Sequence, residues 1–353
     1  IVVKKLIAKN FSEFDGHAMV DFFYDEKTGL KGFIAIHRRN HTKPSFGATR
    51  LYPYSSEIDA LNDALRLSKL MSYKAALAGL PYGGAKGVII QDKKNIKNRT
   101  KILTAYADMI EYLGGRFVTG TDVGLDVKDL AIMQKQTSYV VGMKSDPAAF
   151  TGLGIYYGAQ STLKELYGNE QITGRSFAVQ GLGKVGIELI KLLSKEGGII
   201  IASDVDKKRA LEVKKMFPRV RMVDNREIYR QKVDIFSPCA LSHSINMKNL
   251  PLFRCGAIVG GANNQLENNH VGDSLHRMGI LYTPDYVVNA GGLISVVDEY
   301  EHGNHNKTRV QKKVLKIKET LASIFDISKK VKRPPYSIAD HMAEKIFNEA
   351  HIS

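Results

Sequence analysis

The stretch FAVQGLGKVGIELIKLL, residues 177–193, places three glycines between an apolar run and a helical pattern. In a strand–turn–helix unit, glycines with GxGxxG spacing permit a tight turn, the approach of the backbone to a pyrophosphate and close packing of the helix on the strand. The stretch therefore predicts the first unit of a dinucleotide-binding domain. The loop residues predicted to contact the cofactor are Gly181, Leu182, Gly183, Lys184, Val185 and Gly186.

The next apolar run, GIIIASD, ends in Asp204, close to the spacing of about 20 residues expected after such a loop. A carboxylate there can bind both hydroxyls of an adenosine ribose and would repel a 2′-phosphate, so NAD is favoured over NADP. The basic run at 207–209 leaves a phosphate contact open, although a lysine-rich helix start is more often solvated.

The second half of the chain alternates short apolar runs with helical patterns, which indicates a parallel sheet with crossover helices. The apolar runs are SFAVQ, GIIIASD, VDIFSP, GAIVGGA and LYTPDYVVNAGG. Further on, one long amphipathic helix is predicted before the break at Pro334-Pro335. Its apolar face is marked by Val310, Val314, Ile317, Leu321 and Ile324.

The first half of the chain combines a strand and a helix that lead to a lysine. Residues 30–36 form an apolar run typical of a strand, and residues 55–79 form a helix that opens on serines and ends at a glycine. The helix carries Lys74 in its last turn. It leads into LPYGGAKG, residues 80–87. This stretch fits either a glycine turn with a solvated Lys86 at its tip, or a lysine held in a cleft whose small neighbours let a ligand approach.

The composition places limits on the class of protein. A chain of 353 residues predicts two domains, and 44% hydrophobic with 25% charged residues is typical of a soluble protein. The net charge of +15 is scattered and not interleaved with aromatic residues, so nucleic-acid binding is not favoured. No apolar run is long enough for a membrane span and no secretory signal is present, which predicts a cytoplasmic protein. Two cysteines and no ligand spacing predict no metal site.

Several stretches resemble the glutamate, leucine, phenylalanine and valine dehydrogenase family. MSYKAALAGLPYGGAKGVII and GRFVTGTDVG carry the resemblance, while GATR, SPCAL, GGANNQLENN and PDYVVNAGGLISV fit the leucine-type branch. The resemblance runs in order from about Gly29 to the final helices. It implies a homo-oligomeric enzyme that uses NAD to convert L-amino acids reversibly to 2-oxo acids and ammonia.

The resemblance also implies an α/β architecture in two domains. An N-terminal α/β substrate domain would span residues 1–135, and a doubly wound Rossmann NAD-binding domain would span residues 136–325. The C-terminal helical segment, residues 326–353, would return to the first domain, so that the C-terminal helices pack back across both domains.

Oxidative deamination must hold an α-carboxylate, deprotonate an α-ammonium and activate water. The resemblance assigns Lys74 to the substrate carboxylate, Lys86 to the general base acting through water, and Asp122 to proton transfer at the amino group. Lys86 can act as a base near neutral pH only if burial and a cationic neighbour, expected to be Lys74, lower its pKa.

Three further polar residues match family positions near the cofactor. Asn264 and Asn289 match asparagines near the nicotinamide ribose and the substrate carboxylate, although turn-forming asparagines beside glycines are an alternative. Thr151 matches a threonine that faces the nicotinamide carboxamide.

The residues that match the family's side-chain pocket are apolar or small, namely Phe46, Met71, Gly120, Leu293 and Val296. Glutamate is disfavoured because Phe46 stands where the glutamate enzymes place a lysine, and an unpaired carboxylate against a phenyl ring costs several kcal/mol. Leucine, isoleucine and valine are therefore expected. An aromatic amino acid such as phenylalanine or tryptophan is the alternative, because Gly120 leaves extra room.

The loop from Arg38 to Lys43 is unusually basic, with His37 before it and His41 within it. These residues are expected to be solvated, although binding of an acidic partner stays open. The basic loop and the net charge motivate a second hypothesis, a non-enzymatic NAD-binding protein that recruits an acidic partner or nucleic acid.

Overall fold

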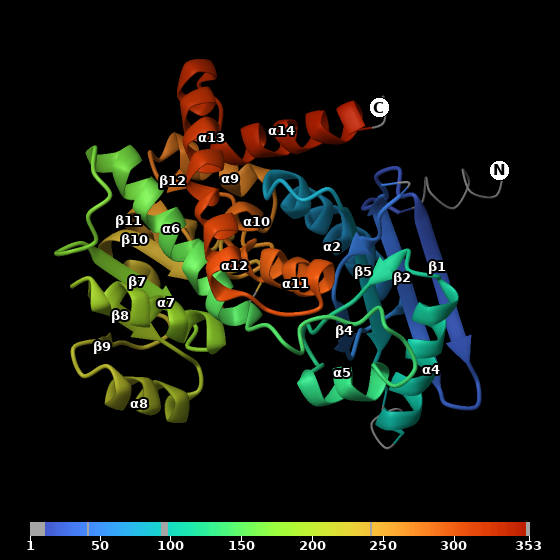
Figure 1. The fold of residues 1–353 in the computed structure, drawn as a ribbon. Helices are drawn as coiled ribbons and strands as arrows, with labels where there is room; N and C mark the ends of the chain where they lie inside the picture. Colours follow the sequence, from blue (N-terminus) through green and yellow to red (C-terminus); the bar gives the residue numbers. More distant parts are fainter. Residues whose placement is uncertain (1–10, 41, 93–97, 241, 351–353) are drawn as a thin grey trace. The chain divides into compact units, whose positions relative to one another are not determined.

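The computed structural model describes residues 11–40, 42–92, 98–240 and 242–350, so His41 and Leu241 of the SPCAL stretch lie outside it. The described chain separates into two compact units, coloured along the sequence in Figure 1. Unit 1 contains the residues up to 145, residues 296–305 and those from 343 onward. Unit 2 contains residues 146–295 and 306–342.

Unit 1 contains a six-stranded mixed sheet in the order β1-β2-β5-β3-β6, with β4 beside β5. β1, β2 and β5 pair antiparallel, whereas β3 and β4 run parallel to β5. The strands are β1 (Met19–Asp25), β2 (Leu30–Arg38), β3 (Ser45–Phe46), β4 (Thr49–Tyr52), β5 (Gly83–Ile90) and β6 (Phe117–Val118). The helices that precede unit 2 are α2 (Glu57–Leu77), α4 (Arg99–Tyr112) and α5 (Val127–Met133).

The helix predicted at residues 55–79 is confirmed as α2. Its first turn is capped by Ser56, whose side chain accepts a hydrogen bond from the backbone N–H of Asp59. Past its end, Gly79 has a φ of +66°, a left-handed conformation that suits glycine after a helix. The helix packs against β2 and β5 and holds Lys74 in its last turn.

The glycines around Lys86 lie in the strand β5 and Lys86 is buried, so the glycine turn with a solvated lysine is wrong. A Cβ on Gly84 would lie 2.0 Å from the backbone nitrogen of Ser72 in α2, and one on Gly87 would lie 2.0 Å from the hydroxyl of Tyr106. Real Cβ atoms do not tolerate such contacts, so only glycine lets helix and strand approach this closely. Close packing of protein on protein explains these small residues.

Unit 2 contains a parallel six-stranded sheet in the order β12-β11-β10-β7-β8-β9, which confirms the doubly wound Rossmann fold. The strands are β7 (Ser176–Gln180), β8 (Ile199–Ser203), β9 (Arg221–Met222), β10 (Lys232–Pro238), β11 (Arg254–Ile258) and β12 (Leu281–Tyr282). The helices up to β12 are α6 (Pro147–Tyr167), α7 (Lys184–Lys195), α8 (Lys207–Met216), the 3-10 turns η1 (Ile228–Arg230) and η2 (Leu250–Leu252), and α9 (Asn269–Arg277).

Two predicted elements differ from the structure. In the run LYTPDYVVNAGG only β12 is a strand, and the two valines lie in the short helix α10 (Asp285–Val288). The predicted long amphipathic helix is two helices, α12 (Lys307–Leu315) and α13 (Ile317–Val331), although all five residues of its predicted apolar face are buried. The remaining helices are α11 (Gly291–His302) and α14 (Pro335–Ala350).

His37 is not solvated, contrary to the expectation for the basic stretch. It lies in β2 with 0% exposure, and its Nε2 is 3.2 Å from a carboxylate oxygen of Asp15. The ring of His17 packs edge-on against it, with centroids 4.8 Å apart. Burial is the largest of the causes that lower the pKa of His37, which falls to about 3. The ring is therefore neutral at neutral pH.

None of the helices in the described part of the chain is both long and apolar enough to cross a membrane.

Candidate active site

Lys86 and Asp122 meet in the interior of unit 1. Lys86 lies in β5 and is 4% exposed, because the strand is covered by α2 and by neighbouring strands. Asp122 follows β6, and its Oδ2 accepts a hydrogen bond from the Nζ of Lys86 at 2.5 Å. The structure thus brings together two of the three residues predicted to carry the chemistry.

Arg50 forms a second ion pair with Asp122. Its Nε donates to Oδ2 of Asp122 at 3.0 Å, and its Nη1 donates to Oδ2 of Asp63 at 2.8 Å. Asp63 also accepts hydrogen bonds from the hydroxyl of Tyr54 and from Arg66, both at 2.6 Å. Sequence reasoning did not single out Arg50, although an arginine in the apolar strand TRLY was a signal that could have found it.

The pKa values of the pair are shifted by burial and by each other. Burial is the largest influence on the pKa of Lys86 and lowers it; Asp122 raises it, Arg50 lowers it, and the net shift is downward. Burial would raise the pKa of Asp122, but Lys86 and Arg50 outweigh it and hold that pKa well below its usual range. Asp122 is therefore ionised near neutral pH, and Arg50 is a cationic neighbour that lowers the pKa of Lys86.

The other residues predicted to bind the substrate are spread over several elements. Lys74 is buried in the last turn of α2, and the half-buried Met71 lies one turn before it. Gly120 precedes Asp122 and is buried; a Cβ there would meet only Val141, 3.2 Å from its carbonyl oxygen.

Phe46 is fully buried in β3. Its ring packs edge-on against the rings of Tyr82 and Tyr300, with centroids 4.7 and 5.2 Å away. The remaining two pocket residues lie in α11, where the buried Leu293 belongs to unit 2 and the half-buried Val296 to unit 1. The division between the units therefore falls within this helix.

The glycine-rich loop of unit 2 has the geometry of an anion site. Gly181 has a φ of +95°, and a Cβ on Gly186 would lie 2.0 Å from the carbonyl oxygen of Gly181. By contrast, nothing lies within 4 Å of a Cβ placed on Gly183. Because α7 starts after Gly183 without a side-chain cap, its N-terminus faces open space. These residues fit the pyrophosphate of a dinucleotide.

Asp204 lies directly after β8 and is tied to the same loop. Its Oδ2 accepts a hydrogen bond from the backbone N–H of Leu182 at 2.7 Å, and its Oδ1 accepts one from Asp206 at 2.8 Å. Burial opposes ionisation, but these N–H groups and Arg209, at 3.4 Å, lower the pKa of Asp204. The side chain is therefore an oriented carboxylate, as binding of ribose hydroxyls requires.

The three polar residues predicted near the nicotinamide lie in unit 2. Asn289 is 4% exposed; its Nδ2 donates to Asn263 at 3.0 Å, while its buried Oδ1 has no hydrogen-bond partner. Asn264 adopts a left-handed φ of +55°, and its Nδ2 lies 2.7 Å from Nε2 of His243, which sequence reasoning did not include. Thr151 donates to the carbonyl of Pro147 at 2.8 Å in the first turn of α6.

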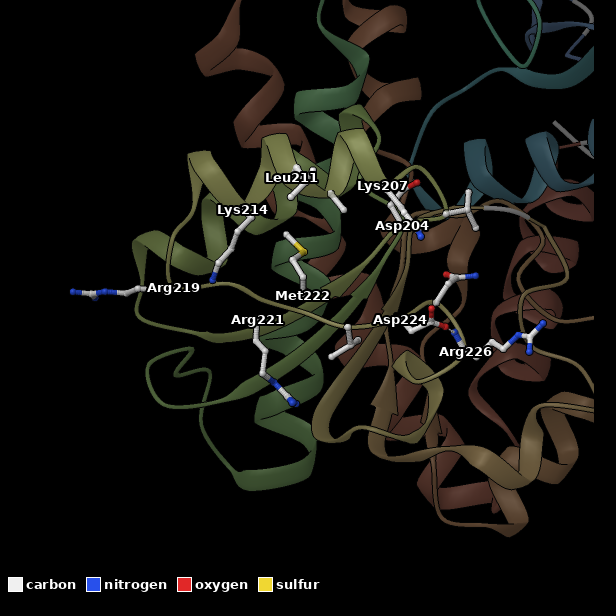
Figure 2. A pocket seen from close by; sticks show the side chains of 13 residues that line it. Asp204, Lys207, Leu211, Lys214, Arg219, Arg221, Met222, Asp224 and Arg226 are labelled. Atoms are coloured by element: carbon white, nitrogen blue, oxygen red, sulfur yellow. Dashed lines mark hydrogen bonds between the residues drawn. The ribbon is translucent and has the colours of Figure 1, made fainter.

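A cavity of about 870 Å³ begins at Asp204 and extends between α8 and β9. Figure 2 shows Lys207, Leu211 and Lys214 of α8 along one side and Met222 of β9 along the other. The space beside the carboxylate therefore has a mixed apolar and cationic lining.

The parallel sheet, its glycine loop and the aspartate after the second strand define a dinucleotide-binding enzyme, and unit 1 adds a buried lysine–aspartate pair. Residues 17–139 match the family described as Glu/Leu/Phe/Val dehydrogenase, dimerisation domain. Residues 142–208 and 201–343 match Glutamate/Leucine/Phenylalanine/Valine dehydrogenase. The chain belongs to this family, as the sequence predicted, and is an amino-acid dehydrogenase whose cofactor class is NAD(P).

Relatives that are named for different substrates have similar sequence identities to this chain. Leucine dehydrogenase of Geobacillus stearothermophilus is 40% identical over 335 residues, covering 93% of this chain and 90% of that protein. Valine dehydrogenase of Streptomyces albus is 38% identical over 347 residues, covering 96% and 94%. The crystal structure of L-tryptophan dehydrogenase from Nostoc punctiforme, 40% identical, superposes with a TM-score of 0.81 over 96% of this chain and 98% of that one.

Proposed function

We propose that this dehydrogenase converts L-leucine and related branched-chain L-amino acids, with NAD, reversibly to 2-oxo acids and ammonia. The observation that carries the chemistry is the 2.5 Å contact between Lys86 and Asp122 in the interior of unit 1. A buried amine with a lowered pKa beside an ionised carboxylate provides two candidate proton acceptors in contact with each other.

Each of the three residues has one role in the proposed reaction. Lys74 holds the substrate carboxylate through charge, and Asp122 accepts a proton from the α-ammonium so that the nitrogen lone pair can assist departure of the hydride. When bound, the cofactor accepts that hydride from the α-carbon. Lys86 then takes a proton from the water that attacks the iminium carbon. Asp122 returns its proton to the nitrogen, the C–N bond breaks to release ammonia, and the hydroxyl proton passes to solvent to give the 2-oxo acid.

Residues of unit 2 would hold the cofactor. The N–H groups at the start of α7 would bind the pyrophosphate beside Gly183, and Asp204 would accept hydrogen bonds from the adenosine ribose. NAD is preferred because Asp204 is ionised and would repel a 2′-phosphate. Thr151, Asn264 and Asn289 would face the nicotinamide end, where the unpartnered Oδ1 of Asn289 offers a hydrogen-bond acceptor.

The proposed preference for branched aliphatic side chains is supported by the apolar and small residues of the pocket. Phe46 offers no partner for a carboxylate in the side chain of the substrate, and its own ring contacts are with the aromatic rings of Tyr82 and Tyr300. An aromatic amino acid is the second candidate, because a Cβ on Gly120 would meet only Val141, which leaves room beside it.

Unit 1 is the proposed site of homo-oligomerisation. It contains the stretch that matches the family's dimerisation domain, and β1 is an edge strand of its sheet. Phe22 and Tyr24 of that strand are 52% and 61% exposed. Apolar rings on a strand edge favour pairing with another protein surface.

The substrate proposal is tested by following NADH oxidation with ammonia and a panel of 2-oxo acids. Turnover is expected to be fastest on 4-methyl-2-oxopentanoate and 3-methyl-2-oxobutanoate. Faster turnover on phenylpyruvate or indolepyruvate would reverse the substrate assignment, and failure to turn over any of them, 2-oxoglutarate included, would overturn the proposed activity. Replacing NADH by NADPH tests the cofactor preference.

The proposed role of Lys86 predicts that Lys86→Ala lowers kcat by about 10² to 10⁴-fold, the usual contribution of a general base. Thermal unfolding and NADH binding should stay close to those of the unchanged protein. Lys128→Ala, at an exposed position of α5 in the same unit, is the matched control. More than about a tenth of the activity remaining in Lys86→Ala would exclude the role.

A further inference from the structure

We propose that Arg50 is a positioning residue of this active site, whose bridge between Asp63 and Asp122 holds the carboxylate of Asp122 against the ammonium of Lys86. The inference rests on the proposed function and deepens it. It concerns a residue that touches neither Lys86 nor, in the proposed mechanism, the substrate, but that shares an oxygen of Asp122 with Lys86.

The fold places Arg50 between two carboxylates. In β4, Thr49 and Leu51 are buried, and the side chain of Arg50, which points to the other face, is 13% exposed. Its two donor atoms reach carboxylates from different elements: Asp122 after β6 and Asp63 in α2. The arginine therefore joins the segment of the proposed proton-transfer residue to the helix that carries Lys74.

Asp63 is itself held in place, so the bridge has a fixed end. The hydroxyl of Tyr54 and the guanidinium of Arg66 donate to the two oxygens of Asp63. Burial raises the pKa of Asp63, but Arg50, Tyr54 and Arg66 outweigh it and keep the carboxylate ionised. Asp63 and Lys74 lie about three turns apart on α2, which puts them on the same side of the helix.

Only arginine can make this bridge. A guanidinium is planar and presents several N–H groups in a fixed fork, so it can donate to both carboxylates at once, whereas a lysine ammonium is a single point charge. The charge also affects the reacting groups. The ionised form of Asp122 is favoured by Lys86 from β5, by Arg50 from β4 and by the backbone N–H of Val123. Arg50 also disfavours the protonated form of Lys86.

Removal of Arg50 should therefore have two effects. Asp122 would lose one of its two cationic partners and its fixed orientation, and a misplaced catalytic group can reduce a rate by about 100-fold. Lys86 would lose a repelling cation but keep Asp122 and Asp63 as attracting anions, so its pKa would rise. The rate of oxidative deamination, which needs neutral Lys86, would then require a higher pH.

The test compares Arg50→Gln and Arg50→Lys with the unchanged enzyme across pH. Arg50→Gln should lower kcat by about 10 to 100-fold and move the acid limb of the kcat profile upward by on the order of one pH unit. Arg50→Lys keeps the charge but not the double bridge, so its kcat should fall with a smaller shift. The KM for the amino acid should change little in both, because Lys74 holds the substrate.

Arg99→Gln is the matched control. Arg99 in α4 donates to both oxygens of Asp129 in α5, at 2.8 and 2.7 Å, and to the carbonyl of Gly124 at 2.6 Å, whereas the described hydrogen bonds of Lys86 and Asp122 do not include it. The Arg99→Gln variant should be less stable than the unchanged enzyme, but its kcat profile should not shift along the pH axis. If Arg50→Gln behaves like Arg99→Gln, with an unchanged profile and kcat within about threefold, the bridge has only a structural role and the proposal is wrong.

A second measurement does not depend on turnover. Acylation of the Lys86 amine by an amine-reactive reagent, followed by peptide mass spectrometry, reports the fraction of neutral Lys86 at each pH. The midpoint should rise in Arg50→Gln, and an unchanged midpoint would overturn the proposal. If Arg50→Gln does not fold, Arg50→Lys decides: wild-type kcat and midpoint in that variant would also overturn it. Absence of turnover in the unchanged protein with a shifted midpoint would instead sink the proposed function alone.

Discussion

Two glycine-rich stretches of this chain have different physical reasons for their glycines. At residues 83–87 in unit 1, the absence of side chains makes room for other parts of the protein: a Cβ placed on Gly84 would lie 2.0 Å from the backbone nitrogen of Ser72. At residues 181–186 in unit 2, Gly181 and Gly186 serve the turn and the packing of α7, but Gly183 faces open space. The first stretch encloses a lysine, and the second leaves room for a ligand.

The aspartates beside these stretches differ in the same way. Asp122 is held by the side-chain cations Lys86 and Arg50, whereas Asp204 is held mainly by the backbone N–H groups of Leu182 and Asp206. The charge of a lysine can change with pH, and a lysine or an arginine can be replaced by mutation, whereas a backbone N–H group keeps its dipole in both cases. The proposed site for proton transfer is thus built from groups whose pKa values depend on one another, and the proposed binding site is built mainly from fixed dipoles.

Replacement of Gly84 by alanine should have the largest effect on this comparison. The new Cβ would lie 2.0 Å from a backbone atom of Ser72, so α2 must move away from β5. We expect Gly84→Ala to lower the free energy of unfolding by about 3 kcal/mol or more, the upper end of the cost of overpacking. Chemical denaturation measures it, and a loss below about 1 kcal/mol would show that the close approach of helix and strand is not needed.

Gly183→Ala is the counterpart in unit 2 and should separate binding from stability. Since nothing lies within 4 Å of the new Cβ, the free energy of unfolding should change by less than about 0.5 kcal/mol. The same methyl group would obstruct the pyrophosphate, so the Kd for NADH should rise about tenfold, equivalent to about 1.4 kcal/mol. Fluorescence titration with NADH measures this, and an unchanged Kd would mean that the pyrophosphate does not approach Gly183.

The smallest expected effect is a difference in acid sensitivity between the units. His37 and His17 are buried in unit 1, whereas every described histidine of unit 2 is exposed, namely His243, His270, His276 and His341. The folded pKa of His37, about 3, lies below the unfolded value of about 6.5. Its contribution to stability is complete above about pH 6.5 and is lost progressively as the pH falls toward 3, by at most about 1.4 kcal/mol per pH unit.

Backbone hydrogen exchange at pH 5 and pH 7.5, corrected for intrinsic rates, measures this difference by region. Peptides from β2 and β5 should lose protection at pH 5, and peptides from β7 and β10 should lose less. His37→Gln should reduce the pH dependence of unit 1, because glutamine does not titrate. Equal losses in both units, or no effect of the substitution, would contradict the prediction.

Local patterns were sufficient where one segment carries its own structural signals. The Rossmann sheet and α2 follow from apolar periodicity, caps and glycine spacing, all of which act over a few residues. Local patterns did not predict that the long helix expected before Pro334-Pro335 is interrupted. The two helices α12 and α13 share one buried face, and no proline or glycine marks the end of the first at Lys316.

Long-range contacts explain what the patterns missed. Arg50 and Asp63 are 13 positions apart and Asp122 lies much further along the chain, so only the packing of β4, α2 and the segment after β6 brings them together. His37 looked like part of a solvated basic run because two arginines follow it, but the direction of its side chain from β2 is inward, toward His17.

The sequence by itself determined the parallel sheet, because apolar periodicity and glycine spacing act over a few residues. Its resemblance to the family indicated Lys74, Lys86 and Asp122 as candidates for the chemistry. Only the tertiary structure decided that the glycines around Lys86 lie in a strand and that Arg50 shares Asp122 with this lysine. The physical reason is that burial and ion pairing are set by segments distant in sequence, and they shift the pKa values on which proton transfer depends.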